Sequence, residues 1–124
     1  MRYIDGFVIP IPKKNVKAYL KMAKLGGKLW KKYGALEYIE AVGDDLPSNM
    51  GGMAFASFPK IAKVKKGETV VFSFIVYKSR KHRDQVNAKV MKDPAMSEDN
   101  FKDKPMPFDM KRMSYGGFQA IVDM

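Results

Sequence analysis

The sequence predicts an α+β fold, because segments typical of strands and segments typical of helices alternate along one short chain. Three segments carry this prediction. Residues 69–77 read as a strand, residues 13–32 show the spacing of an amphipathic helix, and residues 79–93 form a second helical segment that begins at a serine. With the other strands, the expected order is strand, helix, strand, strand, helix, strand. That order is the split βαβ arrangement of ferredoxin-like folds, with an antiparallel sheet and both helices on one face.

The first strand is expected from Tyr3 to about Ile11, where nearby prolines end it. The first helix follows over residues 13–32, and Gly34 is suited to the left-handed residue that ends a helix. The glycine pair at residues 26–27 lowers helix stability, by about 1 kcal/mol for each glycine against alanine. We therefore expect either a kink at this pair or a group that packs closely against the helix backbone.

The remaining elements follow from alternation, turn residues and helix stops. A connection rich in glycine and lysine separates the second and third strands and is interpreted as a hairpin extension. The second helix is expected to point Val86, Val90 and Met91 towards the core and to end before Pro94. In chain order, the expected segments are a strand at 35–42, the connection at 46–66 with a short strand near 53–58, a strand at 69–77, a helix from 79, a loop at 95–110 and a strand at 111–122.

The third strand is apolar on both faces, and both faces must be covered. The two helices of so short a chain cover one face, so we expect a second copy to cover the other, with two sheets packed into a dimeric α/β barrel. The alternation does not say which face meets the partner, and Val71, Ile75 and Tyr77 are the candidates for the subunit contact. The opposite face of this strand carries Val70, Phe72, Phe74 and Val76.

Composition indicates a soluble globular protein with one domain, residues 1–124, because 46% of the residues are apolar and 29% are charged. The chain has no cysteine and one histidine, so we expect no disulfide, no metal site and no cofactor. Without an apolar stretch of membrane-spanning length or a signal-like N-terminus, we expect no membrane contact and a cytoplasmic location.

The net charge of +10 is concentrated in residues 13–32, which hold eight lysines and no acid. On a helix these lysines form one stripe about 100° wide, and the simplest interpretation is a solvated surface. Strong nucleic-acid binding is not expected, because lysines without interleaved arginine or aromatic residues supply neither bidentate contacts nor base stacking. Weak, salt-sensitive nucleic-acid association through this helix face is the alternative.

Several motifs resemble a known family. The second half of the chain contains SRKHRDQVNAKVMKDP at residues 79–94 and MPFDMKRMSYGGF at residues 106–118, and the first half contains YIDGFV at residues 3–8. These motifs resemble the YbaA-like family of small uncharacterised bacterial proteins, and the likeness covers nearly the whole chain. The resemblance implies the dimeric α/β-barrel superfamily, in agreement with the strand pattern, and it implies no established activity.

Three residues are candidates for chemistry. Asp5 lies in an apolar strand, where a buried acid is expensive unless it is paired, and Arg112 or Lys111 of the neighbouring last strand is the expected partner. A structural ion pair is the favoured interpretation and a pocket acid the alternative. His82 lies in the first helical turn among cations that disfavour its charged form, which suits a base, although a solvated histidine is favoured. Asp109 lies in the proline-punctuated loop.

These observations favour a homodimeric binding or accessory protein with a pocket for a small apolar or aromatic ligand between the sheet and the helices. A cofactor-free, monooxygenase-like enzyme is the alternative, by analogy of fold alone. The candidate pocket residues are Tyr3, Asp5, Trp30, Tyr38, Phe108, Arg112 and Tyr115, and the candidate catalytic residues are Asp5, His82 and Asp109.

Overall fold

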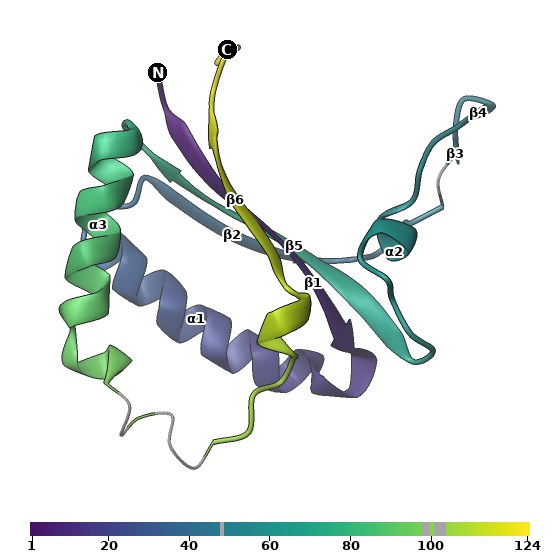
Figure 1. The fold of residues 1–124 in the computed structure, drawn as a ribbon, viewed down its shortest axis with the longest axis horizontal. Helices are drawn as coiled ribbons and strands as arrows, with labels where there is room; N and C mark the ends of the chain where they lie inside the picture. The colour runs from purple at the N-terminus through teal and green to yellow at the C-terminus, as the bar shows by residue number, and fades with distance from the viewer. Residues whose placement is uncertain (48, 98–99, 101–103) are drawn as a thin grey trace.

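The computed structural model describes residues 1–47, 49–97, 100 and 104–124, and its centre is an antiparallel sheet (Figure 1). The strand order is β2-β5-β1-β6, so the first and third of the long strands lie in the middle. Two long helices, α1 and α3, cover one face of this sheet, and the fold is ferredoxin-like as predicted. The elements are β1 (Tyr3–Pro12), α1 (Val16–Lys32), β2 (Glu37–Val42), β5 (Glu68–Tyr77), α3 (Arg80–Lys92) and β6 (Ser114–Gln119).

The hairpin extension between β2 and β5 is present and projects from the body of the domain (Figure 1). It consists of β3 (Asn49–Met50), β4 (Met53–Ala54) and the helical turn α2 (Phe58–Ile61), and we call residues 49–61 the arm. The short strand expected near 53–58 is interrupted because the Ser57 hydroxyl accepts a hydrogen bond from the backbone N–H of Lys60 at 3.2 Å and so starts a helical turn.

The last strand is shorter than the predicted 111–122. Met110–Arg112 form a 3-10 turn before β6, and the Asp109 side chain caps this turn. The predicted loop at 95–110 begins with a second such turn, Pro94–Met96, and part of this loop lies outside the described residues. α3 begins as predicted, because the Ser79 hydroxyl accepts a hydrogen bond from the backbone N–H of His82 at 3.1 Å.

The strand register decides which residues face the helices. Ile9 pairs with Val71, and Asp5 pairs with Ile75, so these side chains share one face. Val71, Ile75 and Tyr77 are buried in the core under the helices. Their assignment to a subunit contact is therefore wrong, because that face of the strand is already covered within one chain.

The core beneath the helices has two clusters of buried residues. One lies under the first half of α1 and the other between α3 and the sheet. Met91 was expected to face the core but is exposed, because Val86 and Val90 form the inward row of α3 and Met91 lies beside it on the helix surface. The clusters are Ile9, Ile11, Tyr19, Ala23, Val71 and Phe108, and Ala35, Ile75, Tyr77, Val86 and Val90.

The glycine pair in α1 is explained by a close contact with Tyr38 of β2. A Cβ atom at Gly26 would lie 2.9 Å from Tyr38 Oη, and one at Gly27 would lie 3.0 Å from Tyr38 Cδ1. The Tyr38 hydroxyl is held in place because it donates a 2.9 Å hydrogen bond to Glu40. The expected close contact against the helix backbone is thus confirmed.

Gly26→Ala is expected to lower the free energy of unfolding by roughly 1 kcal/mol, although alanine is the better helix former by about the same amount. The reason is the contact between the new methyl group and Tyr38 Oη. In a Tyr38→Phe background, which lacks this oxygen, the same substitution should raise the free energy of unfolding. Urea denaturation of the four proteins gives the double-mutant cycle, and an equal effect of Gly26→Ala in both backgrounds would contradict the explanation.

Candidate functional site

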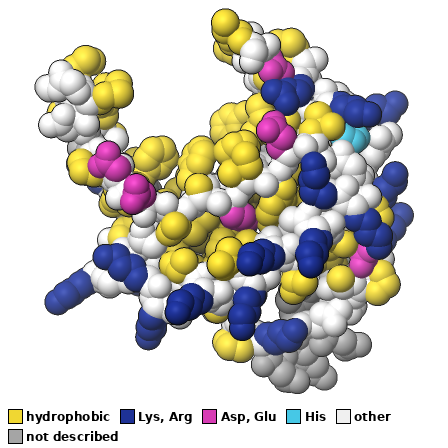
Figure 2. Space-filling view, turned by 180° about the vertical axis from the view of Figure 1, so that it is seen from behind, with side chains coloured by type: hydrophobic (Ala, Val, Ile, Leu, Met, Phe, Trp, Pro, Cys, Tyr) yellow, Lys and Arg dark blue, Asp and Glu magenta, His cyan; other side chains and the backbone are white. Residues whose placement is uncertain are grey.

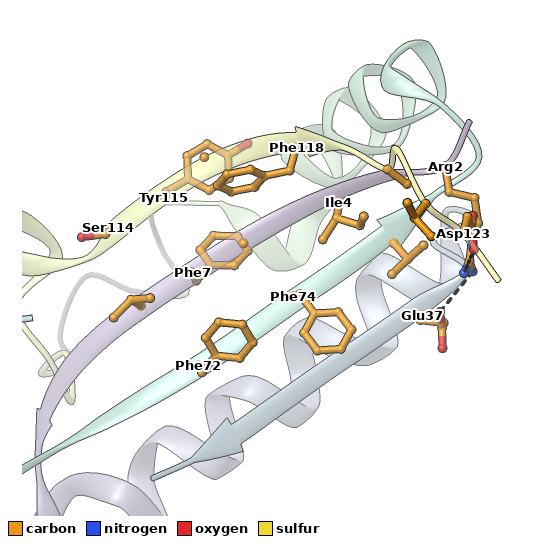
Figure 3. Close-up of a pocket in the computed structure, with 16 residues that line it drawn as sticks. Arg2, Ile4, Phe7, Glu37, Phe72, Phe74, Ser114, Tyr115, Phe118 and Asp123 are labelled. Atoms are coloured by element: carbon orange, nitrogen blue, oxygen red, sulfur yellow. Dashed lines mark hydrogen bonds and ion pairs between the residues drawn. The ribbon is translucent and has the colours of Figure 1, made fainter. Parts of the chain in front are cut away.

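The face of the sheet opposite the helices carries an apolar hollow of about 690 Å³, which we call the open-face hollow (Figure 3). Its walls come from the central strands and from the edge strand β6. Phe72 and Phe118 are 45% and 61% exposed, although both are large apolar side chains on a sheet. The lining includes Ile4 and Val8 of β1, Phe72, Phe74 and Val76 of β5, and Ser114, Tyr115 and Phe118 of β6.

Two glycines shape the floor of this hollow. Gly6 and Gly116 are paired across β1 and β6, and the missing side chains leave space above the sheet. The ring of Phe118 leans over this space, since a Cβ atom at Gly6 would lie 3.4 Å from Phe118 Cε1 and one at Gly116 would lie 3.6 Å from it. The hollow is therefore walled by aromatic rings and open to solvent.

The two ends of the open face are occupied by other segments of the chain. At one end, Arg2 Nε lies 2.7 Å from Asp123 Oδ2, and Arg2 Nη1 lies 3.3 Å from Glu37 Oε2. At the other end, the ring of Phe58 in α2 packs against the ring of Phe72, with 5.9 Å between the ring centres. Figure 2 shows hydrophobic side chains gathered between these two projecting parts.

On the helix side of the sheet, Asp5 is 1% exposed and is paired with Arg83 of α3. Arg83 Nη1 donates to Asp5 Oδ1 at 2.7 Å and to Tyr115 Oη at 2.8 Å. The guanidinium carbon also lies 4.9 Å from the centre of the Tyr3 ring. The expected ion pair is present, but the partner expected from the sequence was wrong, because the first turn of α3 places Arg83 over β1.

Arg112 lies in the turn before β6 and binds Glu68 instead of Asp5. Its Nη1 and Nη2 atoms donate to the two carboxylate oxygens of Glu68 at 2.7 and 2.8 Å. This hydrogen bonding lowers the pKa of Glu68 from 4.5 to about 2, against the opposing effect of burial. The pair connects the turn before β6 to the start of β5.

We expect the melting temperature to fall between about pH 5 and pH 2.5, partly because Glu68 has its pKa lowered in the folded chain. A carboxylate with a lowered pKa stabilises the fold above its unfolded pKa, and this contribution is lost as the pH falls through the folded pKa. Arg112→Gln removes the ion pair, so its melting temperature should fall less over this interval. Calorimetry at several pH values gives the melting temperature of both proteins as a function of pH. If the melting temperature falls equally steeply in the unmodified protein and in Arg112→Gln, this role of the pair is disproved.

The three candidate catalytic residues do not converge. His82 Nδ1 accepts a 2.9 Å hydrogen bond from the backbone N–H of Lys78, and burial together with the charges of Lys78 and Lys89 lowers its pKa. Asp109 is exposed and accepts a 2.9 Å hydrogen bond from the backbone N–H of Lys111. Within the described residues, no hydrogen bond or ion pair joins any two of Asp5, His82 and Asp109.

The predicted pocket residues are distributed over several places. Phe108 packs edge-on against Tyr19, with 5.7 Å between ring centres. Trp30 Nε1 donates a 3.0 Å hydrogen bond to Asn87 Oδ1, and Tyr38 borders a shallow second hollow beside α1. Phe108, Trp30 and Tyr38 thus pack in or against the core on the helix side of the sheet.

Of the seven predicted pocket residues, Tyr115 lines the open-face hollow and the other six do not. Sequence reasoning missed Phe72, Phe74 and Phe118 as site residues. A signal for two of them was present, since Phe72 and Phe74 form the second apolar face of the third strand. Nothing in that alternation distinguishes a face buried by helices from a face left open.

The eight lysines of residues 13–32 are all exposed, and Figure 2 shows basic side chains in a row beneath the apolar area. In the described parts of the chain, no helix is long and apolar enough to cross a membrane. No cluster of three histidine, cysteine or acidic residues that could bind a metal ion is found among these residues either.

Known proteins are similar to this chain along nearly its entire length. The family described as "Protein of unknown function (DUF1428)" matches residues 2–110. The chain is 42% identical over 123 residues to the uncharacterised protein YbaA of Escherichia coli K12 and to that of Shigella flexneri, and the match covers 99% of each chain. A dimeric ferredoxin-like protein from an uncultured marine organism has a TM-score of 0.55 at 11% identity, with all of both chains covered.

Proposed function

The chain belongs to the DUF1428 family of proteins of unknown function, as its resemblance to the YbaA-like proteins predicted, and we propose that it is a homodimeric protein that binds a small apolar or aromatic molecule. The observation that carries this proposal is the open-face hollow, where aromatic rings on a sheet are left exposed. Contiguous apolar surface of this kind marks binding and subunit contacts in soluble proteins.

Packing the open faces of two copies together would bury the apolar side chains that one copy leaves exposed. Removing apolar surface from water stabilises by about 25 cal/mol for each Å², and Phe72, Phe74 and Phe118 offer that surface in the middle of the face. The structural neighbour from the marine organism is described as dimeric. At 11% identity this neighbour has the same fold, and its assembly supports the homodimer as a proposal for the present chain.

When two open faces pack together, each open-face hollow would become an apolar chamber closed by the partner copy. Gly6 and Gly116 leave the space, and the phenylalanine rings make the walls. Ser114 lies in the same lining and provides a hydroxyl group that can orient a bound molecule. A mostly apolar lining with a few polar groups is typical of small-molecule sites.

Gly116→Val tests the chamber, because it adds an isopropyl group to its floor. The nearest atoms to a Cβ there belong to the Phe118 ring at 3.6 Å, so the substitution fits the backbone. The probe is 2-naphthol, an uncharged aromatic molecule, and calorimetric titration should show that it binds the unmodified protein saturably. Its dissociation constant for Gly116→Val should be at least about tenfold higher, which corresponds to a loss of about 1.4 kcal/mol of binding free energy. Ala88→Val, on the exposed surface of α3, serves as the control that introduces the same side chain away from the hollow. Equal affinity of all three proteins, or no saturable binding, would refute the chamber.

A cofactor-free, monooxygenase-like enzyme is the second candidate, and one observation favours it. Tyr115 is 51% exposed on the edge strand β6, and on the helix side of the sheet its hydroxyl accepts a hydrogen bond from Arg83, which binds the buried Asp5. With 1,4-dihydroxynaphthalene as substrate, oxygen uptake above the uncatalysed rate should fall at least about tenfold in Tyr115→Phe. Uptake that is the same in both proteins would exclude this role of the hydroxyl.

A further inference from the structure

We propose that the arm of one copy closes the open-face hollow of a second copy, so that each complete chamber has walls from both chains. This inference rests on the homodimer proposed above and adds which segments meet in it. The partner is a second copy of this chain, and the contact joins the arm to the opposite end of the partner's open face. That end, which we call the terminal rim, contains Arg2, Glu37, Ile121, Val122 and Asp123.

The arm carries apolar side chains that the chain itself leaves in water. Met50 is 69% exposed and Met53 is 61% exposed, and Phe55, Phe58 and Ile61 are exposed as well. The arm contains a two-stranded hairpin with two residues in each strand, and hairpins of this size are at best marginally stable alone in water. A projecting hairpin with an apolar surface therefore requires a partner.

The root of the arm fixes the side on which it stands. Phe58 packs against Phe72, a residue of the open face, with 5.9 Å between the ring centres. The arm thus rises at one end of the hollow, and the terminal rim rises at the other end (Figure 2). Val122 of the rim is 72% exposed and lines the hollow.

A twofold axis between two packed faces allows two arrangements. If the axis runs along the strands, arm meets arm, and if it runs across them, the arm of each copy meets the terminal rim of the other. Charge decides between these arrangements. The arm holds one lysine, Lys60, and no acid, whereas the rim holds two carboxylates, Glu37 and Asp123, against the guanidinium of Arg2.

Pairing arm with arm brings like charges together, and pairing arm with rim brings opposite charges together. The apolar parts match in the same arrangement, because Met50 and Met53 of one copy then face Ile121 and Val122 of the partner copy. The arm would reach the hollow at its open end, where Val122 contributes to the lining. Each chamber would be incomplete without the arm of the other chain.

Because the chain contains no cysteine, single-cysteine variants test this contact cleanly. One protein carries Met53→Cys on the arm, and a second, isotope-labelled protein carries Val122→Cys on the rim. The two proteins are mixed, unfolded and refolded together, and then treated with a short bismaleimide. We expect a cross-linked product that contains one labelled and one unlabelled chain, which can form only between copies. Lys81→Cys, exposed on α3, replaces Met53→Cys in the control mixture and should give at most about a tenth of that product.

Two other outcomes would overturn the proposal. Met53→Cys alone cross-linking as efficiently as the mixture would show that arm meets arm. The absence of a mixed product from protein that sediments as a dimer would refute the arm contact and leave the homodimer standing. A monomer at the same concentration would remove the homodimer itself, so failure of the arm contact is distinguishable from failure of the proposed function.

Discussion

Arg83→Met is expected to lower the free energy of unfolding by about 3–5 kcal/mol, because it leaves the Asp5 carboxylate buried without its cation. The pair is short, 2.7 Å between Arg83 Nη1 and Asp5 Oδ1, and the Arg83 side chain is 13% exposed. Solvent therefore cannot replace the lost partner without opening the space between α3 and β1. Urea denaturation followed by circular dichroism, at one fixed protein concentration, measures the change.

Two companion variants separate the ion pair from the loss of side-chain packing. Arg80→Met changes an exposed arginine on the same helix and should alter the free energy of unfolding by less than about 0.5 kcal/mol. Asp5→Leu combined with Arg83→Met removes both charges and should recover part of the loss. If Arg83→Met destabilises no more than Arg80→Met, the buried pair has no structural role.

Phe72→Asp is expected to convert the proposed homodimer to a monomer, because packing a second sheet over this position would bury a carboxylate without a partner. The dimer dissociation constant should rise at least about a hundredfold, which corresponds to about 2.8 kcal/mol. The single chain should remain folded, since Phe72 is 45% exposed in it. Sedimentation velocity over a concentration series measures the constant.

Met91→Asp is the matched control for that experiment. Met91 is also a large exposed apolar residue, but it lies on α3, on the helix side of the sheet. Its replacement should leave the dissociation constant unchanged. Equal effects of the two substitutions would mean that charge alone, rather than the open face, governs association.

The order of elements could be predicted from the sequence because each boundary has its own local signal. Ser79 caps α3, and Gly34 adopts a left-handed backbone, with φ of 112°, just after α1. Such signals act over a few residues and do not depend on the tertiary structure. The ferredoxin-like topology follows from their order.

Contacts between distant segments could not be predicted in the same way. Neighbouring strands suggested Arg112 as the partner of Asp5, but the crossing of α3 over β1 brings Arg83 to it. The glycine pair in α1 indicated a close neighbour without identifying Tyr38. Side-chain partners of this kind depend on how helices cross the sheet, and a single sequence carries no local signal for that geometry.

The open-face hollow was missed for a related reason. Alternation along β5 shows two apolar faces, and both are apolar enough to be buried. Only the register with β1 and the placement of the helices show that Val71 faces the core and Phe72 faces the open side. The candidate site therefore moved from the helix side of the sheet to the opposite face.

Sedimentation equilibrium of the unmodified protein at micromolar concentration tests most directly whether a second copy covers the open face. We expect the mass of two 14.1 kDa chains across the concentration range. A folded protein with the mass of one chain, stable throughout that range, would contradict the homodimer and the chamber that depends on it.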